Sequence, residues 1–352
     1  MAGLDFPITV ADSIRREAWR LTAKTGIGRA AIHDRPTRLA LLAVMSMAVA
    51  LTITAVAPLW MLLLGPILLG VPHVAGDVRY LILRPPVALR RAFVCCLLFP
   101  LAALVGLRTW VIFDGPYLSL QEIAMGCGAV ALAITLAPGS WTRRLLVAGA
   151  ITPVAYLALT HPKLAGLTLA HLHNFVALSI WLWFAHRAMP SFKHLSVGLF
   201  FLACVGLIMF GAFDDITARF AGFAAPVEYF SSDGWVKALA PGLPEKLALR
   251  LVQVYIFSQA MHYTVWLRLM PQQMHDSPTP STFRDDLKGL RNDFGLFGLL
   301  ALIAAALAVP VYGCYDAAMA NWTYLTIVLF HGWLELAFIA YLAVSGTRLA
   351  RP

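Results

Sequence analysis

The chain has 352 residues, of which 60% are hydrophobic and only 13% are charged. A soluble domain would carry about a quarter charged residues, so this composition excludes an ordinary soluble protein. The net charge is +9, but the basic residues lie between apolar runs, where they report membrane topology and give no reason to expect a nucleic-acid partner. We therefore predict an all-α, polytopic integral membrane protein with one membrane domain.

The N-terminal segment, residues 1–37, is basic and lacks the early apolar run of a signal peptide. Within it, the stretch from Ala11 to Lys24 reads either as an amphipathic helix at the membrane surface or as a solvated tail. The transmembrane domain then occupies residues 38–352. Its apolar runs predict about ten transmembrane helices, over residues 38–57, 58–82, 91–107, 119–137, 143–160, 165–186, 195–213, 247–269, 294–313 and 321–345.

Arginine and lysine are concentrated in the N-terminal segment and in every second loop. The positive-inside rule places these loops and both termini in the cytoplasm, most simply at the inner membrane of a bacterium. Residues 214–246 then form an outer loop, which is either a lid over an opening or a plain connection. Residues 270–293 form a cytoplasmic loop in which a turn-rich linker precedes a short charged helix.

Four histidines lie inside apolar segments on four different predicted helices: His73, His173, His262 and His331. A histidine in hydrocarbon is costly, and it needs a polar partner or a metal, although one alone often only bonds a neighbouring helix. At about 1.5 Å of rise per residue, the four agree in depth to within roughly 10–12 Å. We therefore predict a shared internal metal site. His171 lies two residues before His173 on another face of the helix, and it is the alternative ligand from that segment.

Three of these histidines have a polar residue four positions away or directly beside them. Asp77 follows His73 by four residues, Glu335 follows His331 by four, and Tyr263 adjoins His262. We assign these three residues catalytic or ligand-orienting roles, because metal-bound imidazoles usually hydrogen-bond to a further polar group. Imidazole ligands suit iron, zinc or copper. The sequence leaves open a non-haem iron with a free position for dioxygen and, alternatively, haem b between paired histidines.

One short motif carries a family resemblance. The stretch from Gly70 to Asp77, G-V-P-H-V-A-G-D, resembles the G-x-P-H-G-A-x-D motif of the Brp/Blh family of bacterial membrane β-carotene 15,15'-dioxygenases. The resemblance implies one iron held by histidines, cleavage of β-carotene into two retinals, and roles for His73 and Asp77 as the motif's histidine and acidic partner. Val74 replaces a family glycine, and the family's late H-x-x-x-H pair is missing.

These patterns favour a membrane metalloenzyme, an iron-dependent oxygenase acting on a lipophilic substrate such as a carotenoid, isoprenoid or lipid. The substrate would enter from the membrane lipid, and an electron-transfer protein is a further partner to consider. The alternatives are a haem- or quinone-linked electron-transfer subunit, a proton-coupled transporter that uses the buried ionisable residues as a relay, and a purely structural subunit. The sequence does not fix the oligomeric state.

Overall fold

The computed structural model describes residues 2–275 and 279–346, and its elements are all helical in this part of the chain. The all-α prediction is thereby confirmed. The helices are α1 (Ala2–Thr22), α2 (Gly26–His33), α3 (Arg35–Val56), α4 (Pro58–Val78), α5 (Arg91–Ile112), α6 (Ser119–Leu136), α7 (Trp141–Thr160), α8 (Pro162–Ala188), α9 (His194–Met209), α10 (Asp214–Arg219), α11 (Ser232–Leu239), α12 (Glu245–Thr264), α13 (Met270–Gln273), α14 (Phe283–Tyr315), α15 (Ala317–Val328) and α16 (Phe330–Ser345), with π-helical turns η1 (Arg79–Leu83) and η2 (Val265–Leu269).

Within the described residues, eight helical segments are long and apolar enough to cross a membrane, which supports the predicted membrane class. They are α3, α4 with η1, α5, α6, α7, α8, α14, and α15 with α16. Two further predicted spans fall on α9, which is apolar but shorter, and on α12, which is more polar. The count of ten spans therefore stays a prediction.

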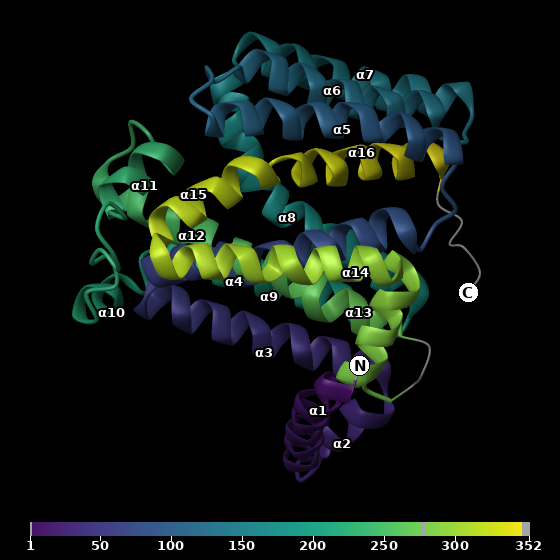
Figure 1. Ribbon diagram of the computed structural model, residues 1–352, viewed down its shortest axis with the longest axis vertical. Helices are drawn as coiled ribbons and strands as arrows, with labels where there is room; N and C mark the ends of the chain where they lie inside the picture. Colours follow the sequence, from purple (N-terminus) through teal and green to yellow (C-terminus); the bar gives the residue numbers. More distant parts are fainter. Residues whose placement is uncertain (1, 276–278, 347–352) are drawn as a thin grey trace.

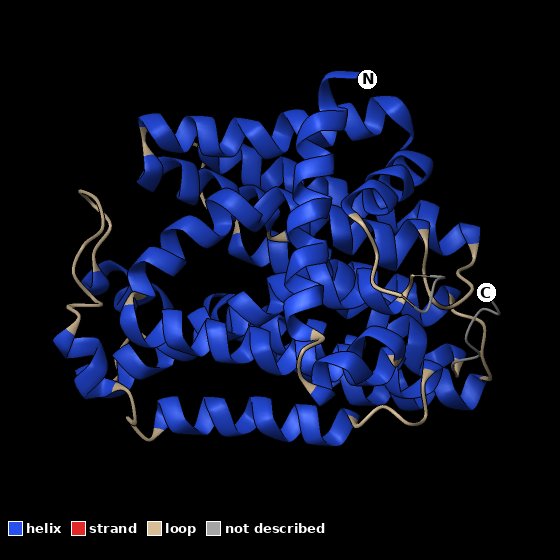
Figure 2. Cartoon of the chain, turned by 90° about the horizontal axis from the view of Figure 1, so that it is seen from below, coloured by secondary structure: helices blue, strands red, loops and turns tan. Residues whose placement is uncertain are grey.

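The long helices lie side by side in a bundle (Figure 1). Helices α5, α6 and α7 form its upper layer in this view, and α16 packs beneath them against α6 and α8. Helix α12 lies at the centre, in contact with α3, α4, α8 and α9. Most loops gather at the ends of the helices (Figure 2). This arrangement brings α4, α8, α12 and α16 together in the interior.

The outer surface of the bundle is apolar. Helix α7 has no buried residue, and Leu145, Leu146 and Val154 on it are exposed. Apolar surface on this scale is unusual on a soluble monomer, whereas it is what a helix surface needs in contact with lipid. The interior carries the polar residues: His73, Asp77 and further groups described below.

Two predicted segments differ from the structure. The last predicted span, 321–345, is two helices, because α15 ends before Leu329 and α16 begins at Phe330. The predicted helix 294–313 is continuous in α14 with the short charged helix predicted before it, and the two are separated by a kink at Gly295, whose φ of 70° lies in the left-handed region that glycine tolerates. The short charged helix predicted inside the cytoplasmic loop is thus the start of α14.

The N-terminal segment is helical and packs against the start of α14. Arg15 donates to the backbone carbonyl of Ser281 at 2.7 Å, and its guanidinium lies 4.0 Å from the ring centre of Phe283. On another side of α1, Ile14 and Leu21 are 66% and 61% exposed. These exposed apolar side chains favour an amphipathic helix at the membrane surface over a solvated tail.

The segment 214–246 contains α10 and α11 and is anchored to the bundle. Thr217 donates from its hydroxyl to the carbonyl of Ala55 at 2.8 Å and accepts from the Gln253 amide at 2.9 Å. Arg250 pairs with Asp214 near the start of α10. In the view of Figure 1 this segment lies at the left edge of the molecule.

Candidate metal centre

Four imidazoles meet in the interior, one from each of α4, α8, α12 and α16. The ring centres of His73 and His173 each lie 5.1–5.2 Å from those of His262 and His331, and the last two rings are 5.4 Å apart. His73, His262 and His331 are buried, at 1%, 1% and 6% exposure. The structure thus brings together all four histidines that the sequence singled out.

Three of the four rings are held through Nδ1 by a backbone carbonyl three or four residues earlier in the chain, which for His331 belongs to the preceding helix α15. The pairs are His73 with Leu69 at 3.3 Å, His173 with Leu169 at 2.9 Å, and His331 with Val328 at 2.5 Å. A carbonyl oxygen only accepts, so these contacts place the proton of a neutral ring on Nδ1. Nε2 is then left with a free lone pair, which is the arrangement that a metal-binding histidine needs.

His262 completes the cluster and is held less firmly. Neither of its ring nitrogens has a hydrogen-bond partner within the described part of the chain, and its Nε2 lies 3.7 Å from Oε1 of Glu335. The same Glu335 oxygen accepts from Nε1 of Trp266 at 3.0 Å, while Oε2 has no partner among these residues. Glu335 is therefore placed to orient His262 or to accept a proton from it.

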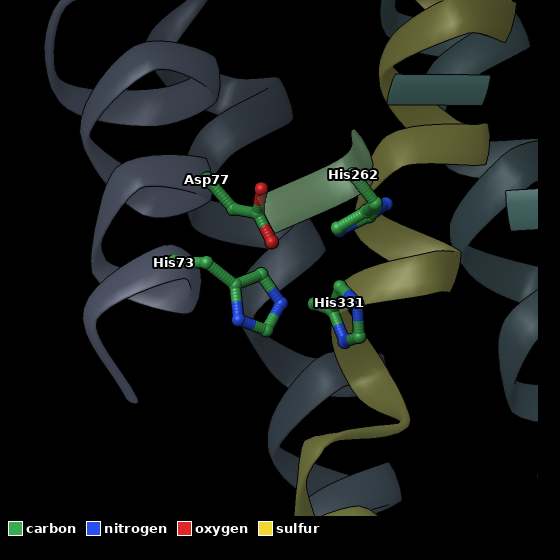
Figure 3. A group of neighbouring side chains, drawn as sticks. All are labelled: His73, Asp77, His262 and His331. Carbon is green, nitrogen blue, oxygen red and sulfur yellow. The ribbon is translucent and has the colours of Figure 1, made fainter. Parts of the chain in front are cut away.

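Asp77 faces the cluster from α4, one turn beyond His73 (Figure 3). It is 0% exposed, and neither carboxylate oxygen has a hydrogen-bond partner in residues 2–275 and 279–346. One ligand atom from each of His73, Asp77, His262 and His331 lies within 4.8 Å of the others. An unpaired carboxylate in a dry interior is costly, and a bound cation would offset that cost.

The ring spacing fits a single ion. With a metal–nitrogen distance of about 2.1 Å and a further ~1.1 Å to the ring centre, two imidazoles at a tetrahedral angle have centres about 5.2 Å apart. The observed separations are 5.1–5.4 Å for five of the six ring pairs. The ligand atoms of His73, Asp77, His262 and His331 lie within 4.8 Å of one another, and atoms at that distance would each move by about 0.7 Å to reach the spacing of about 3.4 Å between two ligands of one tetrahedral ion. Both the donor set and the spacing therefore fit a metal.

The choice between the two histidines of α8 follows from their partners. Nε2 of His171 lies 2.8 Å from the carbonyl oxygen of Leu239, and its ring packs edge-on against Tyr255. His171 is thus turned toward α11, whereas His173 belongs to the cluster. The two-residue offset places their side chains on different faces of the regular helix α8.

Aromatic side chains close the site on the α4 side. The ring of Tyr263 is centred 4.5 Å from that of His73, and the Tyr324 hydroxyl is 3.4 Å from Nδ1 of His73. Tyr324 packs so closely against Gly70 that a Cβ added there would lie 2.4 Å from its ring. Gly70 in the G-V-P-H-V-A-G-D motif therefore makes room for Tyr324.

Sequence reasoning missed Trp266 and Tyr324. Trp266 follows His262 by four residues, the same spacing that singled out Asp77 and Glu335, so this signal was present. Tyr324 lies on α15, before the helix break, and no spacing rule connects it to His331 on α16.

Comparison with known proteins gives no family assignment, because no family model, curated protein or solved structure matches this chain.

Proposed function

We propose that this protein is a membrane-embedded, histidine-ligated metalloenzyme, a non-haem iron oxygenase acting on a lipophilic substrate. The observation that carries the proposal is the convergence of four imidazoles from four helices, three with Nδ1 engaged by a backbone carbonyl and Nε2 free. A structural hydrogen-bond network would engage both nitrogens of its histidines, whereas a ligand set leaves one nitrogen of each free.

Iron is proposed because imidazole-rich sites suit it and because the motif around His73 resembles that of the Brp/Blh carotenoid dioxygenases. Bound iron would supply the binding and activation of dioxygen. On this proposal His73, His173, His262 and His331 are the ligands. A carotenoid is the narrower substrate proposal, and an isoprenoid or another lipid is the broader one.

The surrounding residues have distinct proposed roles. Asp77 balances the charge of the cation, and Glu335 orients His262 and holds a proton near it. Trp266 fixes Glu335 through its indole N–H at 3.0 Å. The ring of Tyr263, 4.5 Å from that of His73, bounds the space beside the ligands and keeps bulk water from it.

The compactness of the cluster favours a single ion over haem. A porphyrin separates its two axial imidazoles and extends sideways well beyond them. Here each of His262 and His331 has its ring centre within 5.4 Å of those of all three other histidines. A macrocycle between any two rings would therefore collide with a third.

The test is to purify the full chain in detergent and to measure its metal content and absorption spectrum. We expect about one iron per chain, lost in His73→Ala and His331→Ala and kept in the matched control His171→Ala, with oxidative cleavage of a supplied carotenoid. Folded protein that never binds iron would overturn the proposal. A Soret band would favour haem, and metal-independent proton-coupled uptake into vesicles would favour a transporter.

A further inference from the structure

A cavity of about 400 Å³ lies between α1, η2, α13 and α14, where the N-terminal helix packs against the bundle. A second hollow, of about 460 Å³, adjoins it along α1 and α3 and shares Arg15, Arg268 and Phe283 with it. Each volume falls within the range of about 300–1,000 Å³ that is typical of small-molecule sites.

The two arginines leave this cavity with an excess of positive charge. Arg15 pairs with Asp286, with its Nη1 3.4 Å from Oδ2 of the carboxylate. Arg268 has no hydrogen bond and no acidic partner in the described part of the chain. Two guanidinium groups thus line the cavity against a single carboxylate, so an anion would be attracted to Arg268.

The rest of the cavity wall is mainly apolar and reaches toward the metal centre. Leu69, Leu267 and Tyr263 contribute to the lining. Tyr263 is also the residue whose ring lies 4.5 Å from that of His73, and the Leu69 carbonyl is the acceptor for Nδ1 of that histidine. A hydrocarbon chain bound along this wall would reach Tyr263, the residue that separates the cavity from the imidazole cluster.

We propose that this cavity binds an amphiphile with an anionic head, a carboxylate or a phosphate, on a single hydrocarbon chain. The head lies beside Arg268 and Arg15, and the chain packs against Leu69, Leu267 and Tyr263. Ile14 and Leu21 on the exposed side of α1 place the opening at the membrane surface, where such molecules are concentrated. The site does not depend on the metal centre.

The experiment measures displacement of a fluorescent fatty-acid probe from the full chain in a neutral detergent, with and without a metal chelator. We expect dodecanoate and dodecyl phosphate to displace the probe, and dodecanol and inorganic phosphate to fail. The ratio of the first two affinities distinguishes a free fatty acid from a lipid phosphate as the occupant. Arg268→Gln should weaken binding about 10- to 100-fold, the usual effect of a charged hydrogen bond of about 1.5–3 kcal/mol.

Three variants complete the test. Arg268→Lys should retain part of the affinity, Leu267→Trp should lower it by filling the apolar wall, and Arg29→Gln, an equal loss of charge on α2, should leave it unchanged. Displacement by dodecanol as effective as by dodecanoate would overturn the proposal, as would Arg268→Gln protein with wild-type affinity. Binding that survives the chelator would support this site even where the iron proposal fails.

Discussion

Replacing Asp77 with asparagine should have opposite effects on the metal-free and the metal-loaded protein. The carboxylate is 0% exposed and unbonded among the described residues, although it lies beside three imidazoles. Without a metal, the substitution exchanges an ionisable group for a neutral amide, which costs less to bury. With a metal, it removes the negative charge nearest the ligands.

The size of the metal-dependent effect can be worked out. Polar groups that support metal ligands typically change affinity 10- to 100-fold. At a free metal concentration of about 100 times the wild-type Kd, binding stabilises the wild type by about 2.7 kcal/mol. A tenfold weaker Kd lowers this gain to about 1.4 kcal/mol, and a hundredfold weaker Kd lowers it to about 0.4 kcal/mol. The metal-dependent stabilisation should therefore fall by about half or more.

Tryptophan fluorescence can follow thermal unfolding, because Trp181 is fully buried in the folded protein. Asp77→Asn should show a metal-free midpoint at or above that of the wild type, and a smaller rise on adding ferrous iron. The matched control is Asp316→Asn. Asp316 caps the N-terminus of α15 and is not one of the proposed ligands, and asparagine caps a helix as well as aspartate does. A lower metal-free midpoint with an unchanged response to iron would refute the reasoning and make Asp77 a structural group.

Two further pairs of variants test the packing and the ligand set. Gly70→Ala should destabilise the protein by about 1–3 kcal/mol through the clash with Tyr324, whereas Gly106→Ala on α5, with nothing within 4 Å, should raise its stability by up to ~1 kcal/mol. Thermal unfolding measures both, and a shift of the same sign in each would contradict the packing argument. His173→Ala should abolish bound metal in elemental analysis, and His171→Ala should retain it. The reverse result would show that α8 is rotated from its position here.

Hydropathy was sufficient for the class of fold and for most helix positions, because lipid demands a continuous apolar run for each span. It could not reveal the break at Leu329. The letters on both sides, V-L-F-H-G-W, read as one apolar helix, and no proline among them marks the end of α15. Gly295 gave a weak signal for the kink in α14, since an isolated glycine is common in membrane helices.

Helical periodicity was sufficient to predict those residues of the site that share a helix with a histidine. Spacing by four linked Asp77 to His73 and Glu335 to His331, and the structure places both carboxylates beside the imidazoles. Tyr324 enters from a helix whose rotation no local pattern fixes, and it contacts His73 across the bundle. Contacts between helices depend on crossing angles and on small residues such as Gly70. Residue spacing within one helix does not reveal these contacts.

The irregular turns of the helices lie next to the cluster, and this placement has a physical reason. The π-helical turn η1 follows Asp77 closely, η2 follows His262, and the break at Leu329 immediately precedes α16. A break inside an apolar segment leaves backbone groups without helical partners, which hydrocarbon does not tolerate. Here the imidazole of His331 bridges the break, because its Nδ1 lies 2.5 Å from the carbonyl oxygen of Val328, the last residue of α15. The break and the ligand thus stabilise each other: the histidine satisfies the backbone, and the backbone fixes the tautomer that leaves Nε2 free for a metal.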